Sequence, residues 1–262
     1  MKKILRSPLL SGLLAFFAAL VGFFLRSIQL RTELLADGSL AEGSYLHILL
    51  LALSGLCVAV FALALSQMEK ESGWQRVFSG KPLPNTLQIV SAIVLLTGNV
   101  ILLLQGGPAI AASRAPAIAQ LLSRLEAPLG LLAALCLILF AVSCLQKKKP
   151  SPLFYMGLSL YLTVRLIAHF QIWNTDPSIQ DYLYQLLATI CCMLGTFHLA
   201  GFSFDKGKRR VSLFWTLCAV VFCAVSAADM LYSSDLSGLM VTVSLLLTMT
   251  VSSISLLFCK EA

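Results

Sequence analysis

The sequence predicts an all-α membrane protein, a polytopic helix bundle of about eight transmembrane helices with its N- and C-termini both in the cytoplasm. Composition is the first reason, because 58% of the 262 residues are hydrophobic and only 12% are charged, whereas soluble domains carry about 25% charged residues. The second reason is a series of uncharged runs, each close to the roughly 20 residues that a helix needs to cross a bilayer. The third is that lysine and arginine gather in alternate connections, as they do in cytoplasmic loops.

Eight runs qualify as spans, and together they are expected to form a single membrane-embedded helical domain over residues 1–262. The runs are continuous and rich in Leu, Ala and Phe, whereas a transmembrane β-barrel would show alternating polarity. Prolines fall mostly between the runs or at their ends, where they interrupt no helical hydrogen bonds. The expected spans are about 9–30, 44–66, 87–105, 127–145, 152–173, 181–203, 211–231 and 236–258.

The fourth span is expected to start at residue 127, with Pro128 in its first turn, where a missing N–H loses no hydrogen bond. In the loop before it, the polar residues Gln120, Arg124 and Glu126 lie on one face of a short helical pattern and apolar residues lie on the other. This pattern predicts a separate short helix, either on the outer membrane surface or capping the bundle.

The 19 lysines and arginines predict the orientation. With the N-terminus inside, 14 of them fall in cytoplasmic segments, 4 in outer segments and Arg165 within a span, which is the bias that cytoplasmic loops show. The small chain and short loops favour the bacterial cytoplasmic membrane as its location. The run Leu9–Leu25 could instead belong to a cleaved signal peptide, but it has 17 apolar residues where a signal core has roughly 7–15, so a retained first span is expected.

Several function classes lack their sequence signals. The chain has no zinc-ligand spacing, no HExxH, no GxxxxGK[ST] loop and no nucleophile elbow. No metal, cofactor or catalytic residue is therefore expected, and the sequence favours a non-enzymatic protein. Nothing resembles a nucleic-acid-binding module, so the partner that the composition requires is the lipid bilayer. The eight cysteines lie in or beside apolar runs, which predicts packing roles and no disulfide framework.

Ionisable residues inside spans are the candidates for a functional site, because charge within a bilayer is costly. Arg165 and His169 share one face of the fifth span, Asp181 begins the sixth, and Asp229 lies near the end of the seventh. In the expected topology these four lie in the outer half of the membrane, whereas the inner half holds His198 and otherwise mainly Ser, Thr and Cys. The clustering predicts an outward-facing polar pocket in which Arg165 contacts a small anionic ligand.

A structural interpretation competes with ligand binding. Arg165 and Asp229 differ in depth by roughly one helical turn, so they could form a buried ion pair that only fixes the packing of two helices. Three functions therefore remain open. The first is a small-solute transporter component or membrane sensor that uses the pocket.

The second is an accessory or assembly protein that contacts a membrane-protein partner through its helices, suggested by the small-residue stripes Gly55–Ala59 and Ala15–Ala19. The third is a membrane-embedded enzyme that uses His169 with Asp181 or Asp229 as acid and base.

Overall fold

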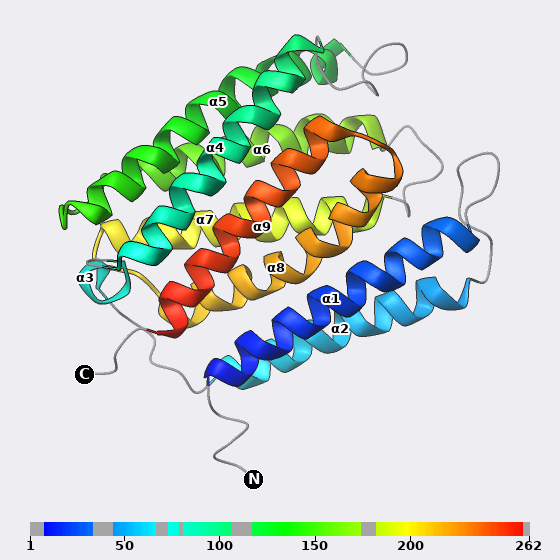
Figure 1. The fold of residues 1–262 in the computed structure, drawn as a ribbon, viewed down its shortest axis with the longest axis horizontal. Helices are drawn as coiled ribbons and strands as arrows, with labels where there is room; N and C mark the ends of the chain where they lie inside the picture. The colour runs from blue at the N-terminus through cyan, green and yellow to red at the C-terminus, as the bar shows by residue number, and fades with distance from the viewer. Residues whose placement is uncertain are drawn as a thin grey trace.

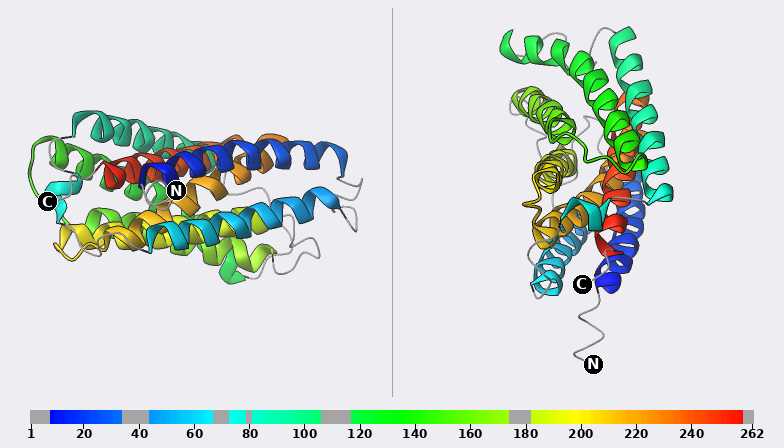
Figure 2. Two further views of the ribbon diagram at one scale, coloured as in Figure 1. Left: turned by 90° about the horizontal axis from the view of Figure 1, so that it is seen from below. Right: turned by 90° about the vertical axis from the view of Figure 1, so that its left-hand side faces the viewer.

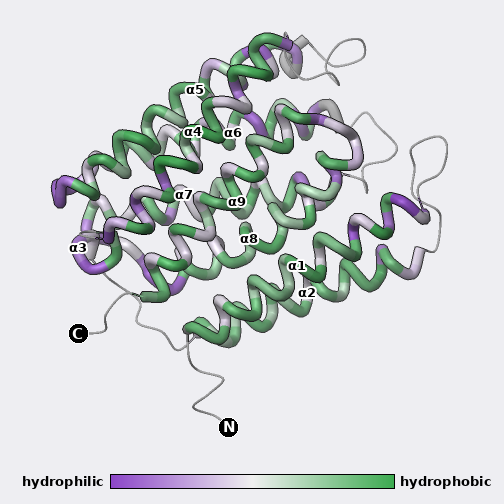
Figure 3. The backbone as a smooth tube through the Cα atoms, in the orientation of Figure 1, coloured by the Kyte–Doolittle hydropathy of each residue, from purple (hydrophilic) through white to green (hydrophobic). Residues whose placement is uncertain are grey.

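The computed structural model describes residues 8–33, 44–66, 73–78, 81–105, 117–173 and 182–258. In these segments, eight helices are long and apolar enough to cross a membrane, which confirms the predicted all-α polytopic bundle (Figure 1). Figure 3 shows hydrophobic residues along most of the length of these helices. The helices are α1 (Pro8–Thr32), α2 (Tyr45–Leu65), α4 (Pro82–Leu104), α5 (Ala117–Leu145), α6 (Leu153–Trp173), α7 (Leu183–Ser203), α8 (Arg209–Tyr232) and α9 (Leu236–Leu257), with a short α3 (Trp74–Val77) between α2 and α4.

Six of the helices form a closed ring. From α4 to α8, each helix packs against the next one along the chain. Helix α9 then packs back against α4 and closes the ring (Figure 2, right). Most of α8 is buried, because α1 and α2 cover its outer side while α7 and α9 flank it within the ring. Large apolar side chains such as Phe16, Leu63 and Leu104 are exposed on the outside of the bundle, as expected where lipid replaces water.

The two ends of the bundle differ in charge. At one end, which we call the basic end, α1, α4, α6 and α8 begin and the described lysines of the connections gather, together with Arg209 and Arg210. Short turns join α5 to α6, α7 to α8 and α8 to α9, and each contains a residue with positive φ, namely Lys147, Asp205 and Ser234, a conformation that often ends a helix. The remaining end is called the opposite end.

A short helix closes the ring at the basic end. Phe78, directly after α3, lies 5.4 Å from Phe140 of α5 and 5.8 Å from Phe202 of α7, measured between ring centroids. Tyr155 of α6 completes this aromatic cluster, 4.4 Å from Phe140. Trp74, Val77 and Phe78 are all buried. The aromatic rings therefore fill the space between α5, α6 and α7 on this side, and edge-to-face packing stabilises them there.

Polar contacts and small residues bring the ring helices close together. Ser91 of α4 lies 2.9 Å from the Thr248 hydroxyl of α9, and its carbonyl accepts a hydrogen bond from Ser244. Gln88 donates to the same Thr248 hydroxyl at 3.4 Å. This polar ladder includes Gln88, which lies toward the basic end of α4, in the half where the sequence predicted His198 and otherwise mainly Ser, Thr and Cys.

The N-terminal part of α5 differs from the prediction. Residues 117–145 form one continuous helix with Pro128 in its interior, so the expected break at residue 127 and the separate surface helix were wrong. The apolar positions before Pro128 continue in phase into the span, and packing against α4 and α6 compensates for the one hydrogen bond that proline removes. As a consequence, Glu126 lies inside the bundle and is 1% exposed.

Candidate functional site

Arg165 forms a buried ion pair with Glu126. Its Nη1 donates to Glu126 Oε1 at 2.7 Å and to the Tyr161 hydroxyl at 3.2 Å. His169, one turn further along α6, places Nε2 3.0 Å from Glu126 Oε2. One carboxylate from α5 thus contacts both basic residues of α6, which is the arrangement that makes an ionised group tolerable inside a bilayer.

The expected pairing of Arg165 with Asp229 is wrong. Asp229 Oδ1 accepts a hydrogen bond from Arg26 Nε of α1 at 2.6 Å, and the Arg26 guanidinium lies 5.4 Å from the Tyr184 ring centroid. The depth of Asp229 along α8 does not decide its partner, whereas its angular position around the helix does. At about 3.6 residues per turn, Asp229 lies roughly a quarter of a turn from the face of α8 that carries Ser226 and Met230, and it points out of the ring toward α1.

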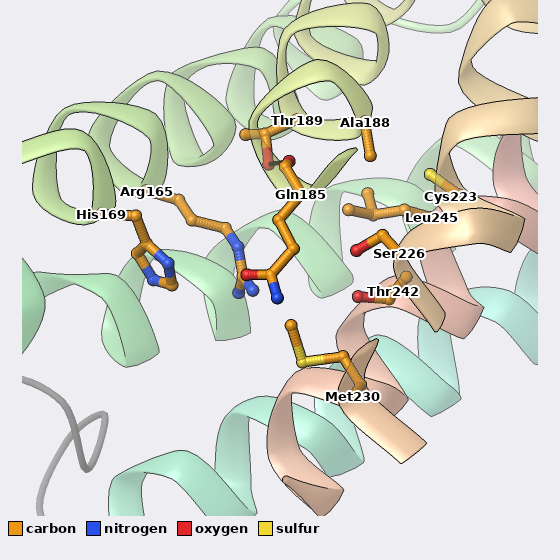
Figure 4. Close-up of a pocket in the computed structure, with 10 residues that line it drawn as sticks. All are labelled: Arg165, His169, Gln185, Ala188, Thr189, Cys223, Ser226, Met230, Thr242 and Leu245. Carbon is orange, nitrogen blue, oxygen red and sulfur yellow. Dashed lines mark hydrogen bonds between the residues drawn. The ribbon is translucent and has the colours of Figure 1, made fainter. Parts of the chain in front are cut away.

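A small polar pocket lies inside the ring beside Arg165 (Figure 4). Helices α6, α7, α8 and α9 supply its walls. Its volume is about 10 Å³, which is close to the smallest cavity that can hold one water molecule. The lining residues are Arg165, His169, Gln185, Ala188, Thr189, Cys223, Ser226, Met230, Thr242 and Leu245.

Several polar groups around this pocket have no partner within the described part of the chain. Ser226 and Thr242 are 2% and 6% exposed, yet their hydroxyls form no hydrogen bond with any described residue, and neither does the Gln185 side chain. Arg165 uses only Nη1 for Glu126 and Tyr161. Its Nε and Nη2, on the other edge of the guanidinium, donate to no described residue. Unpartnered buried atoms also occur away from the pocket, at Trp74, Tyr184 and Ser212, so what sets the pocket apart is that its polar groups surround one shared space beside Arg165.

The sequence located part of this constellation. The structure brings the predicted residues Arg165 and His169 together and adds Gln185, whereas Asp229 belongs to the separate pair with Arg26. Asp181 lies outside the described residues. Glu126 was missed because it was placed in a loop. The in-phase apolar positions on either side of Pro128 were the signal that could have located it within a span.

Metal and thiol chemistry find little support in the described segments. No group of three or more His, Cys, Asp or Glu side chains that could hold a metal ion occurs in them. Seven cysteines are described, and all are free thiols. Cys192 of α7 and Cys223 of α8 are in contact, with their sulfur atoms 3.4 Å apart. Both are buried, which fits the predicted role of cysteine as a small packing residue.

No protein-family model, curated protein or solved structure matches the chain.

Proposed function

We propose that this integral, multi-pass membrane protein binds a small oxyanion, most simply a carboxylate, in the pocket of the ring, as a transporter component or a membrane sensor. The observation that supports the proposal is the unused edge of Arg165. Nε and Nη2 are two parallel donors, and this fork matches the two oxygens of a carboxylate. Gln185, Ser226 and Thr242 supply further polar groups around the same space (Figure 4).

The pocket is accessible from one side only in this proposal. The aromatic cluster around Phe78 fills the space between α5, α6 and α7 at the basic end, which the positive-inside rule assigns to the cytoplasm. Gln185 lies near the start of α7 and Met230 near the end of α8, so both are close to the opposite end of the bundle. Both side chains are long and have several rotatable bonds. Their rotation enlarges the space from the size of a water molecule to that of a solute entering from outside.

His169 adjusts the charge of the site. Arg165 and Glu126 cancel one another, so a bound monoanion would be uncompensated in a low-dielectric interior. A proton on His169, which contacts the same carboxylate, gives the three residues one net positive charge and balances the anion.

The test is the thermal stability of the purified protein in detergent, with sodium formate, acetate or chloride as probes. We expect formate or acetate to raise the melting temperature in a saturable manner and chloride to raise it less. Arg165→Lys keeps a charge beside Glu126 but lacks the fork, and Ser226→Ala combined with Thr242→Val removes only pocket hydroxyls. Both variants are expected to lose the response. Arg124→Lys, at an exposed position of α5, is the matched control. Equal responses to all three anions, or a response that survives both variants, would contradict the proposal.

Proteoliposomes then distinguish transport from sensing. Accumulation of labelled acetate that depends on Arg165 indicates a transporter component, and binding without accumulation indicates a sensor.

An assembly role is the second candidate, and one of its two motivating stripes favours it. Ala15 and Ala19 are buried within the chain, so that stripe is already used between helices. In contrast, a Cβ added to Gly55 meets no atom within 4 Å, and Ala59 is exposed. Small residues on a free helix face allow another helix to approach closely. Co-purification of a stoichiometric membrane protein that is lost in Gly55→Leu would support this role, and a monodisperse monomer in mild detergent would count against it.

A further inference from the structure

A second cavity lies on the outer surface of the bundle, near the opposite end and apart from the pocket in the ring. Helices α1 and α9 are close at the basic end, where a Cβ on Gly12 would lie 2.6 Å from the Leu257 side chain, and they diverge toward the opposite end (Figure 1). Along the diverging part, α1 and α8 enclose a groove of about 440 Å³. Its lining includes Phe24, Ser27, Ile28 and Arg31 of α1 and Leu231 and Tyr232 of α8.

The groove has the polarity of a membrane lipid. Its walls are mostly apolar, and Phe24, Ile28 and Leu231 are each about half exposed. Among its described lining residues Arg31, in the last turn of α1, is the charged one, and none of them is acidic. Arg31 forms no hydrogen bond or ion pair with another residue in the described segments. Tyr232, in the last turn of α8, adds a phenolic hydroxyl at the same level.

We propose that this groove is a binding site for one anionic phospholipid. The acyl chain lies along Phe24, Ile28 and Leu231, and the headgroup phosphate binds the Arg31 guanidinium beside Tyr232. A groove that faces hydrocarbon is filled by lipid chains, and a guanidinium at the level of the headgroups binds phosphate through charge-assisted hydrogen bonds. Tyrosine at the membrane interface matches this position, since its ring is apolar and its hydroxyl is polar.

The site connects lipid to the packing of α1. Arg26, whose ion pair with Asp229 holds α1 against α8, lies one to two turns before Arg31 on the same helix. A lipid in the groove contacts both helices beyond this pair. Occupancy is therefore expected to stabilise the attachment of α1 to the ring without contacting Arg165.

Native mass spectrometry with phosphatidylglycerol and phosphatidylcholine of identical acyl chains tests the proposal. We expect one phosphatidylglycerol to be retained in preference to phosphatidylcholine. Arg31→Gln should reduce that preference about fivefold, the factor that corresponds to one cation beside an anionic headgroup. Ser27→Trp, which fills the groove, should reduce retention of both lipids. Arg124→Gln is the matched control, because Arg124 is an exposed arginine near the start of α5 that lines neither pocket.

Equal retention of the two lipids by the wild-type protein, or a preference that is unchanged in Arg31→Gln, would overturn the proposal. A fall of equal size in Arg124→Gln would do the same, because it would indicate a general surface charge effect. None of these readouts depends on the oxyanion pocket, so the two proposals can fail separately.

Discussion

Two buried arginine–carboxylate pairs in the described part of the bundle use the same chemistry for different purposes. Arg26 and Asp229 connect α1 to α8 outside the ring, and Arg26 also donates to Gln29 at 2.9 Å and lies over Tyr184. Arg26 is 1% exposed. Arg165 and Glu126 connect α6 to α5 inside the ring, and one edge of Arg165 faces a pocket. The difference indicates that a buried arginine is a functional candidate when its donors are only partly used.

Removing Asp229 should have the largest effect on stability. Asp229→Leu leaves the charge of Arg26 without its carboxylate in the core, which typically costs 3–5 kcal/mol, roughly the total stability of a marginal domain. Adding Arg26→Met should recover most of this loss, because an apolar pair replaces the ionic one. Unfolding in mixed detergent micelles measures both effects.

A cross-pair control tests which residues are partners. Arg165→Leu combined with Asp229→Leu should be at least as unstable as Asp229→Leu alone, since the two residues belong to different pairs. Recovery in that double variant would instead support the pairing that the sequence suggested and would contradict the structure.

An intermediate effect is expected where α4 and α5 approach closely, next to the inner ion pair. A Cβ on Gly130 would lie 1.9 Å from Asn99 Oδ1, so Gly130→Val should destabilise the protein by about 1–3 kcal/mol through overpacking. Gly55→Ala, at a helix position with no atom within 4 Å of the new Cβ, should be neutral or slightly stabilising, because glycine is a poor helix former. Equal losses in the two variants would argue against the close contact of α4 and α5. Thermal unfolding in detergent is the measurement.

A smaller effect sharpens the distinction between pocket and core. Ser226→Ala with Thr242→Val should leave stability within about 0.5 kcal/mol of the wild type, because neither hydroxyl has a hydrogen-bond partner to lose. Ser91→Ala removes the contact with Thr248 at 2.9 Å and should cost about 0.6 kcal/mol, the average for such bonds between membrane helices. A larger loss in the pocket variant than in Ser91→Ala would show that the pocket hydroxyls are structural.

The smallest effect is expected at the exposed pair of Lys149 and Asp205 at the basic end. A hydrogen bond from Lys149 lowers the pKa of Asp205, so its contribution to stability is present above the unfolded carboxyl pKa of about 3.9 and is lost as the pH falls through the lower folded value. Both side chains are about half exposed, and solvent screens such pairs. Asp205→Asn should not change the melting temperature measurably at pH 7 or pH 3, and a clear loss at pH 7 alone would contradict this.

The sequence by itself determined the helical class, the number of spans and the presence of a costly arginine in the fifth span, because each depends on local composition over about 20 residues. The register of side chains around each helix was decided only by tertiary packing. Asp229 and Ser226 lie three residues apart on α8, yet one faces α1 and the other faces the pocket. Glu126 was assigned to a loop until packing against α4 and α6 carried α5 past Pro128. Hydropathy reports how deep a residue lies, but which neighbour it meets depends on how the helices close into a ring.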